Sequence, residues 1–204
     1  MRINCFHTIA VVCLSALCGA SLARGQDKLR WDMISVQFRA PSAPNIVSAG
    51  GADSAVNNDA TGMPKLRITI TGSGTFSPWD PTDVTGGGDY TIRNLKGDVV
   101  DSGSYTVTAL VSWVLDSLSP SPPVVVNNVT NTSAEDFLNG LAIFRIAYTD
   151  GSKGILVVSC AGPGATDKPY EGISVIKGLV HFQVPVAPVA NVDANRTVFV
   201  VVHN

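Results

Sequence analysis

A glycine followed two residues later by an aromatic residue recurs three times in the middle of the chain. The steps are Gly74-Thr75-Phe76, Gly88-Asp89-Tyr90 and Gly103-Ser104-Tyr105. The aromatic residues are 14 and then 15 positions apart (76 to 90 and 90 to 105), which is about one strand plus its turn. The repeat therefore predicts consecutive antiparallel strands, in which each glycine makes room for a bulge or for a neighbouring ring.

Apolar and polar residues alternate around this repeat, as they do in half-buried strands. Leu66, Ile68 and Ile70 alternate with polar residues, and a longer apolar file runs along residues 105–115. Asp150-Gly151 between two apolar runs is typical of a hairpin. We expect eight strands, over residues 31–40, 66–71, 88–95, 104–115, 141–149, 154–160, 173–184 and 197–203.

Eight such strands predict an all-β fold, either a single antiparallel β-sandwich or a closed barrel. The alternation fits both architectures equally well. At most one short helix is expected, because residues 133–136 resemble a weak capping box and Asn139-Gly140 would end the helical turn. With 204 residues, 45% of them hydrophobic, the chain is long enough for one well-buried core.

The N-terminus has the features of an export signal. Arg2 supplies a positive charge, residues 9–17 form an apolar core, and Ser21-Leu22-Ala23 fits a cleavage site. We expect residues 1–23 to be removed, which leaves residues 24–204 as a single β domain in a secreted or periplasmic location. Long loops are expected near residues 41–64 and 116–134, where the sequence carries little strand periodicity.

Cysteine and charge counts narrow the classes of function. Cys5, Cys13 and Cys18 lie in the expected signal, so Cys160 alone stays in the mature chain and no internal disulfide can form. Without Arg2, 13 basic residues (14 − 1) stand against 16 acidic ones, which gives a formal charge of −3. The basic residues are scattered singly, so we expect no nucleic-acid partner. The mature chain also has no apolar run long enough for a transmembrane segment.

Few side chains in the mature chain are suited to catalysis. It has one cysteine, two histidines and two glutamates. A hydrolase or transferase would need Cys160 to be an exposed thiolate with a partner such as His181, whereas a buried thiol would act as a small hydrophobe. This scarcity favours a protein that is not an enzyme, although it leaves the question open.

The sequence predicts no cofactor and no metal site. The histidines and the cysteine lack the spacing of a zinc site, and Gly86-Gly87-Gly88 lacks the residues of a phosphate-binding loop. Asp80 with Asp83, and Asp98 with Asp101, could supply oxygen ligands to calcium. Neither pair follows an EF-hand pattern, and aspartate beside proline or glycine is also typical of turns.

Trp79 is the residue that most suggests recognition of a ligand. It lies in a Ser-Pro-Trp-Asp-Pro segment between two expected strands, where an exposed ring could stack on a sugar while Asp80 or Asp83 accepts hydroxyl hydrogen bonds. Tyr170 is a second aromatic residue in an expected loop. We therefore name Trp79, Asp80, Asp83 and Tyr170 as candidate ligand-binding residues. In the alternative interpretation, Trp79 folds back as a lid over the core.

The leading hypothesis is an exported, non-catalytic β-domain protein with a structural or ligand-binding role, with an extracellular glycan as the ligand. The first alternative is an eight-stranded barrel that holds a small apolar ligand inside. The second is a Cys160-dependent hydrolase or transferase. The sequons at Asn128, Asn131 and Asn195 are relevant only in a eukaryotic source.

Overall fold

The computed structural model describes residues 27–39, 43–59, 61–118, 125–130 and 136–203. The expected signal, residues 1–23, and the start of the expected helical turn, residues 133–135, lie outside these ranges. The described part of the chain is built almost entirely of β-strands, which confirms the all-β prediction. It contains no helix that is long and apolar enough to cross a membrane.

Fourteen strands follow one another along the described residues. They are β1 (Lys28–Gln37), β2 (Asn45–Ala49), β3 (Ala52–Asn58), β4 (Pro64–Thr71), β5 (Ser73–Phe76), β6 (Gly87–Asn94), β7 (Val99–Leu118), β8 (Val125–Asn128), β9 (Phe137–Tyr148), β10 (Lys153–Cys160), β11 (Gly172–Lys177), β12 (Val180–Phe182), β13 (Val184–Pro185) and β14 (Thr197–Val202).

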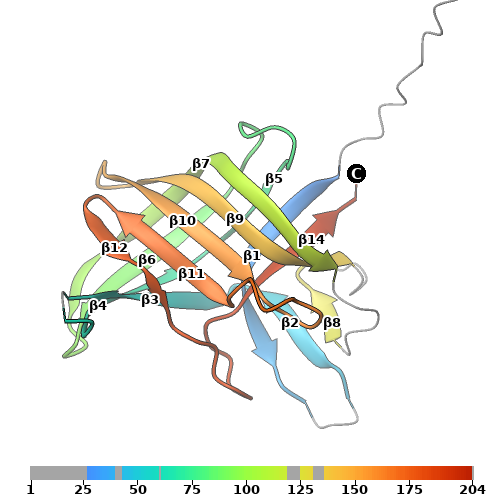
Figure 1. Cartoon of the computed structure of the whole chain (residues 1–204), viewed down its shortest axis with the longest axis horizontal. Helices are drawn as coiled ribbons and strands as arrows, with labels where there is room; N and C mark the ends of the chain where they lie inside the picture. The colour runs from blue at the N-terminus through green and yellow to red at the C-terminus, as the bar shows by residue number, and fades with distance from the viewer. Residues whose placement is uncertain (1–26, 40–42, 60, 119–124, 131–135, 204) are drawn as a thin grey trace, which may run out of the picture.

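Six of these strands close into an antiparallel barrel (Figure 1). The ring runs from β9 through β14, β1, β5, β6 and β7 and back to β9. Of the two architectures that the sequence leaves open, the chain therefore adopts the barrel. Its core has fewer strands than the eight expected, because the other strands are packed outside it.

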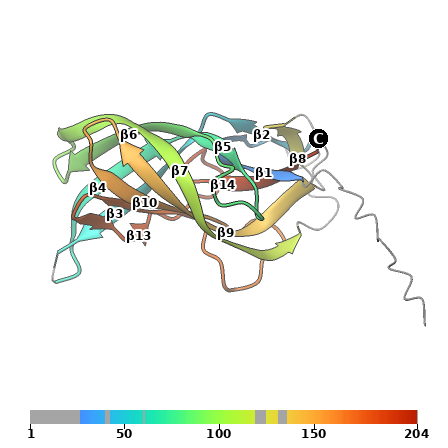
Figure 2. The same ribbon diagram turned by 90° about the horizontal axis from the view of Figure 1, so that it is seen from above.

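The additional strands extend the barrel in two directions. Strands β10, β11 and β12 continue from β9, whereas β4, β3 and β13 continue from β6. The second half of β1, from Ile34 to Gln37, pairs with β2, and β2 pairs in parallel with β8. Figures 1 and 2 show β2 and β8 lying together beside β1, at one end of the molecule. We call β2, β8 and this half of β1 the small sheet.

The expectation of a long loop at residues 41–64 was wrong. This segment contains β2, β3 and the first residue of β4. The sequence does not predict strand β3, because its residues are mostly small or polar and do not alternate between apolar and polar. These small and polar residues fit their positions in β3. Ala55 is fully buried, and the hydroxyl groups of Ser54 and Thr69 lie 2.9 Å apart across the β3–β4 pair.

Three other expected boundaries also differ from the structure. Within the expected loop at residues 116–134, residues 116–118 belong to β7 and residues 125–128 form β8. Residues 173–184 are not one strand but the hairpin β11–β12, since Gly178 has a φ of 57° and Leu179 is fully exposed at the turn. The described end of the expected helical turn, residues 137–140, belongs to β9.

Aromatic side chains fill the interior of the barrel. Trp31, Phe76, Phe144 and Phe199 are all fully buried. The ring of Phe76 lies 5.4 Å from that of Phe144 and 6.2 Å from that of Phe199, and the ring of Trp31 lies 5.5 Å from that of Phe144. Such edge-on and tilted contacts stabilise a dry core beyond the effect of area burial alone. Buried aromatic side chains therefore occupy the interior of the ring.

The glycines of the repeat allow segments to approach one another closely. A Cβ atom on Gly88 would lie 2.0 Å from the carbonyl oxygen of Thr71, and one on Gly74 would lie 2.1 Å from that of Thr85. Gly103 is different, because the ring of Tyr90 lies across it, with Cε1 3.1 Å from the added Cβ position. A neighbouring ring thus covers Gly103, as expected. At Gly74 and Gly88 the missing side chain instead allows the backbone of another segment to approach.

We predict that Gly88→Ala lowers the free energy of unfolding by about 3 kcal/mol, because two backbone segments would have to separate. Gly103→Ala is the matched control. Its neighbours are the side chains of Tyr90 and Thr149, which can shift, so we expect a loss of about 1 kcal/mol. Urea denaturation followed by tryptophan fluorescence measures both values. Equal losses would contradict a backbone contact as the cause.

Candidate functional site

A cavity of about 280 Å³ lies between the small sheet and the outer wall of the barrel. Its lining comes from the small sheet, from β9 and β14, and from the segments that follow β10 and precede β11 and β14. The lining residues are Ile34, Val36, Phe38, Asn45, Val47, Val125, Phe137, Leu138, Asn139, Cys160, Ala161, Gly162, Pro163, Glu171, Pro188, Arg196, Thr197 and Val198. The volume is close to the lower end of the range for small-molecule sites.

The walls of the cavity are apolar because strand alternation directs one file of side chains into it. Ile34, Val36 and Phe38 follow one another at every second position along β1 and beyond its end. Val36 is paired with Val47 of β2, which also lines the cavity. Buried residues around Ile34 and Val47 form a second hydrophobic cluster, separate from the core of the barrel.

Glu171 lines the cavity and holds two strand ends together. Its Oε2 accepts a hydrogen bond of 2.7 Å from the backbone N–H of Ala161, which follows β10. Its Oε1 accepts one of 2.8 Å from the backbone N–H of Thr197, the first residue of β14. Burial raises the pKa of the Glu171 carboxyl group, while these two hydrogen bonds oppose the increase.

Arg196 is the positively charged residue of the lining. Its Nη2 donates a hydrogen bond of 3.2 Å to the carbonyl oxygen of Val189, and its Cζ lies 5.4 Å from the centre of the Phe38 ring. Its Nε is enclosed and has no hydrogen-bond partner among the described residues. Arg196 also lowers the pKa of the Glu171 carboxyl group through its charge, although no ion pair joins the two.

Asp53 on β3 is a second buried carboxyl group near Glu171. It is fully buried, and its Oδ1 accepts a hydrogen bond of 2.6 Å from the backbone N–H of Ser54. Its Oδ2 has no hydrogen-bond partner in the described part of the chain. Burial raises the pKa of Asp53 to about 8, and the nearby charge of Glu171 adds to the increase. Asp53 is therefore largely protonated at neutral pH.

The structure brings Trp79, Asp80 and Asp83 together in the loop after β5. Trp79 is 71% exposed, as expected for a recognition residue and contrary to the interpretation as a lid. Asp80 closes a turn by accepting hydrogen bonds from the backbone and hydroxyl groups of Thr82. Asp83 forms an ion pair of 2.6 Å with Lys28, at the start of β1.

Tyr170 does not join this group. It precedes Glu171, whose partner Thr197 is paired with Met33 of β1. Met33 lies five residues along the strand from Lys28, which corresponds to about 17 Å. Figure 1 likewise shows the loop after β5 and the connection between β10 and β11 on different sides of the barrel. Tyr170 is half-buried, and burial raises its pKa to about 12.

Cys160 and His181 are not neighbours. The thiol group of Cys160 is buried, and burial raises its pKa far above the usual value. His181 on β12 is exposed and is paired with Ile176 of β11, which in turn is paired with Ile155 of β10, five residues from Cys160. The pairing does not bring the imidazole to the thiol, so these residues do not form the catalytic pair that a Cys160-dependent enzyme requires.

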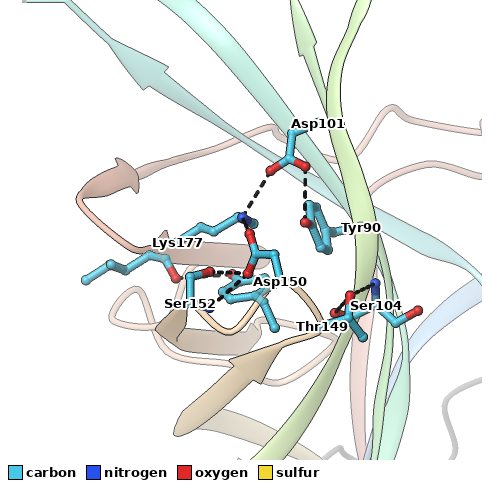
Figure 3. Close-up of polar contacts among 9 residues, drawn as sticks. Tyr90, Asp101, Ser104, Thr149, Asp150, Ser152 and Lys177 are labelled. Atoms are coloured by element: carbon cyan, nitrogen blue, oxygen red, sulfur yellow. Dashed lines mark hydrogen bonds and ion pairs between the residues drawn. The ribbon is translucent and has the colours of Figure 1, made fainter.

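Lys177 forms the densest ionic cluster of the described residues (Figure 3). Its Nζ lies 3.0 Å from Oδ2 of Asp101 and also contacts Oδ2 of Asp150 in the β9–β10 turn. The same Nζ lies 5.2 Å from the ring centre of Tyr90 and 5.1 Å from that of Tyr148. The hydrogen bond from Lys177 holds the pKa of Asp150 well below its usual value. The cluster joins β7, the β9–β10 turn and β11, so its role is structural.

The described residues contain no group of three or more histidine, cysteine or acidic side chains that could hold a metal ion. Asp98 accepts a hydrogen bond of 2.9 Å from Asn94, while Asp101 is bound to Lys177. The aspartates that the sequence offered as calcium ligands therefore serve turns and an ion pair.

The sequence did not reveal the cavity, because its lining comes from segments that are far apart in the chain. Phe38 and Arg196 are separated by 158 positions (196 − 38), yet they are in contact. Ile34 and Val36 fall within the strand expected over residues 31–40, but a strand does not by itself indicate a binding surface. Glu171 belongs to no motif that would mark it as part of a site.

We predict that Asp53→Asn reduces the dependence of stability on pH. The protonated carboxyl group is favoured in the folded state, whereas in the unfolded chain it loses its proton above about pH 4. The contribution of Asp53 to stability is thus complete below pH 4 and is lost as the pH rises towards 8. In that window the free energy of unfolding of the variant should fall less steeply, by up to about 1.4 kcal/mol per pH unit.

Urea denaturation between pH 4 and pH 9 tests this prediction. Asp98→Asn serves as the control, because Asp98 is exposed. If the slope of the Asp53→Asn variant equals that of the wild type, Asp53 is ionised in the folded protein and the assignment is wrong.

Comparison with known proteins found no matching family model, no similar curated protein and no similar solved structure. The role of each residue of the cavity is therefore inferred from the contacts within this chain.

Proposed function

We propose that the mature chain is an exported, non-catalytic binding protein that holds a small, mainly apolar ligand in the cavity between the small sheet and the barrel. The observation that carries this proposal is the cavity itself, whose lining is mainly apolar and includes a few polar groups. This combination is typical of small-molecule sites, in which apolar area supplies affinity and a few polar groups fix orientation.

The filled barrel interior supports this location for the ligand. Trp31, Phe76, Phe144 and Phe199 occupy the space in which a wider barrel would hold its ligand. The proposed ligand is therefore small and mainly apolar, as in the barrel hypothesis, but its site lies outside the six-stranded ring.

The burial and hydrogen bonding of the potentially reactive side chains support a non-catalytic role. Cys160 is buried and has a raised pKa, and both oxygens of Glu171 accept backbone hydrogen bonds. A general base or a nucleophile has to reach its substrate at a suitable pKa. These groups stabilise the fold instead.

We predict that the cavity binds 1-octanol and that Val36→Trp weakens this binding at least tenfold, because the indole ring would occupy the cavity. Gln37→Trp is the matched control, since Gln37 is exposed and does not line the cavity. Isothermal titration calorimetry measures affinity, and thermal unfolding verifies that both variants fold. If octanol fails to bind, or binds equally to all three proteins, the proposal is wrong.

A second candidate function is glycan binding by the loop after β5, and the 71% exposure of Trp79 favours it. An exposed indole ring beside the Asp80 carboxylate offers a stacking surface and a hydrogen-bond acceptor. We predict that Trp79→Ala abolishes retention on a polysaccharide panel and leaves stability unchanged. Leu179→Ala, which removes a fully exposed apolar side chain elsewhere, is the control. Retention by Trp79→Ala would rule out this function.

A further inference from the structure

We infer that the ligand of the cavity is a small amphipathic carboxylate whose head group is bound by Arg196. This inference rests on the proposed function, because it assigns the chemistry of the ligand to the same cavity. Three observations support it: the donors that Arg196 has available, the absence of an ion pair for its charge among the described residues, and the size and polarity of the surrounding walls.

The first observation concerns hydrogen-bond donors. An arginine side chain has five N–H donors in a planar arrangement. Nη2 of Arg196 donates to Val189, and Nη1 has no hydrogen-bond partner among the described residues. Nε is fully enclosed and out of reach of the cavity, so Nη1 and the second N–H of Nη2 are the donors that can meet an acceptor on a ligand. The guanidinium group suits a carboxylate best, because the two can form parallel hydrogen bonds.

The second observation concerns charge. The ion pairs of the described residues involve Lys28, Arg30, Lys177 and His203 but not Arg196. The acidic groups on the surrounding elements are engaged elsewhere. Glu171 accepts from Ala161 and Thr197, Asp193 accepts from Val36, Asp32 of β1 is paired with Arg30, and Asp53 accepts from Ser54. An anionic ligand would therefore supply the direct ion pair that the guanidinium group does not make with any described residue, in surroundings where apolar walls strengthen the attraction.

The third observation concerns the fit of the rest of the ligand. The cavity of about 280 Å³ corresponds to about nine water molecules at about 30 Å³ each. A ligand with about ten non-hydrogen atoms would fill it. The apolar part of the lining consists mainly of valine, isoleucine, leucine and phenylalanine, so an unbranched or cyclic hydrocarbon tail suits it. A cationic head group is disfavoured, because it would meet Arg196 while Glu171 is already engaged.

Backbone contacts place Arg196 firmly at the cavity. Its carbonyl oxygen accepts a hydrogen bond of 3.1 Å from the N–H of Ile34, and the next residue, Thr197, is held by Glu171. The ring of Phe38 lies against the guanidinium group from the small sheet. The head group is therefore expected to meet a side chain whose position is fixed before the ligand arrives.

Calorimetric titration with sodium octanoate, 1-octanol and octylamine at pH 7.5 tests the inference. For the wild type we expect octanoate to bind at least tenfold more tightly than octanol, and octylamine to bind more weakly than both. Arg196→Gln should reduce the preference for octanoate to less than threefold while the affinity for octanol stays the same. Arg196→Lys should retain part of the preference, because it keeps the charge without the planar fork.

Arg67→Gln is the matched control, since Arg67 is exposed on β4 and lies outside the cavity. Equal affinities for octanoate and octanol in the wild type would overturn the assignment of the head group and leave the proposed cavity intact. Tighter binding of octylamine would also overturn it, without relying on any variant. If none of the three compounds binds, the proposed function itself fails.

Discussion

The narrow interior of the six-stranded ring is the constraint on which the rest of the structure depends. A ring of this size has room for side chains alone, and here Trp31, Phe76, Phe144 and Phe199 fill it. Neighbouring strands of the ring approach one another closely where glycine has no side chain, as at Gly87 of β6 against the carbonyl oxygen of Tyr105 of β7. These side chains occupy the centre of the ring, and the cavity described above lies where the small sheet meets the outer wall of the barrel.

The sequence predicted the strands that alternate or turn in a recognisable way. Asp150-Gly151 forms the hairpin between β9 and β10, with Gly151 at a φ of 85°. Strand β3 was missed because Ala55, Ser54 and Asp53 are buried without forming an apolar file, and only the pairing with β4 explains their burial. The turn at Gly178 was missed because apolar residues continue on both sides of it. Local patterns thus predicted the fold class, whereas pairing partners fixed several strand boundaries.

The candidate site was less accessible to sequence reasoning than the fold. The sequence left open whether Trp79 is exposed or folds back over the core, and only the structure shows that its ring is exposed. Whether Tyr170 lies beside it depended on the order of strands around the barrel, which periodicity does not reveal. The same limitation hid the cavity, where Phe38 contacts Arg196 although neither belongs to a motif. Contacts between segments that are far apart in the chain depend on the order in which the strands pair. Only the structure reveals that order.

Among the polar residues that line the cavity, different groups stabilise the fold and are available to a ligand. Glu171 fixes the start of β14 through the N–H of Thr197, and Ile34 fixes the carbonyl oxygen of Arg196, so the backbone is held without any contribution from the guanidinium group. The Arg196 side chain has one hydrogen bond, to Val189, and one ring contact, to Phe38. Since losing one partly exposed hydrogen bond costs only about 1 kcal/mol, the fold can tolerate a change at this side chain. The guanidinium group of Arg196 thus contributes little to the stability of the fold, while the backbone of this residue is held in place at the cavity. This combination suits a group that binds a ligand.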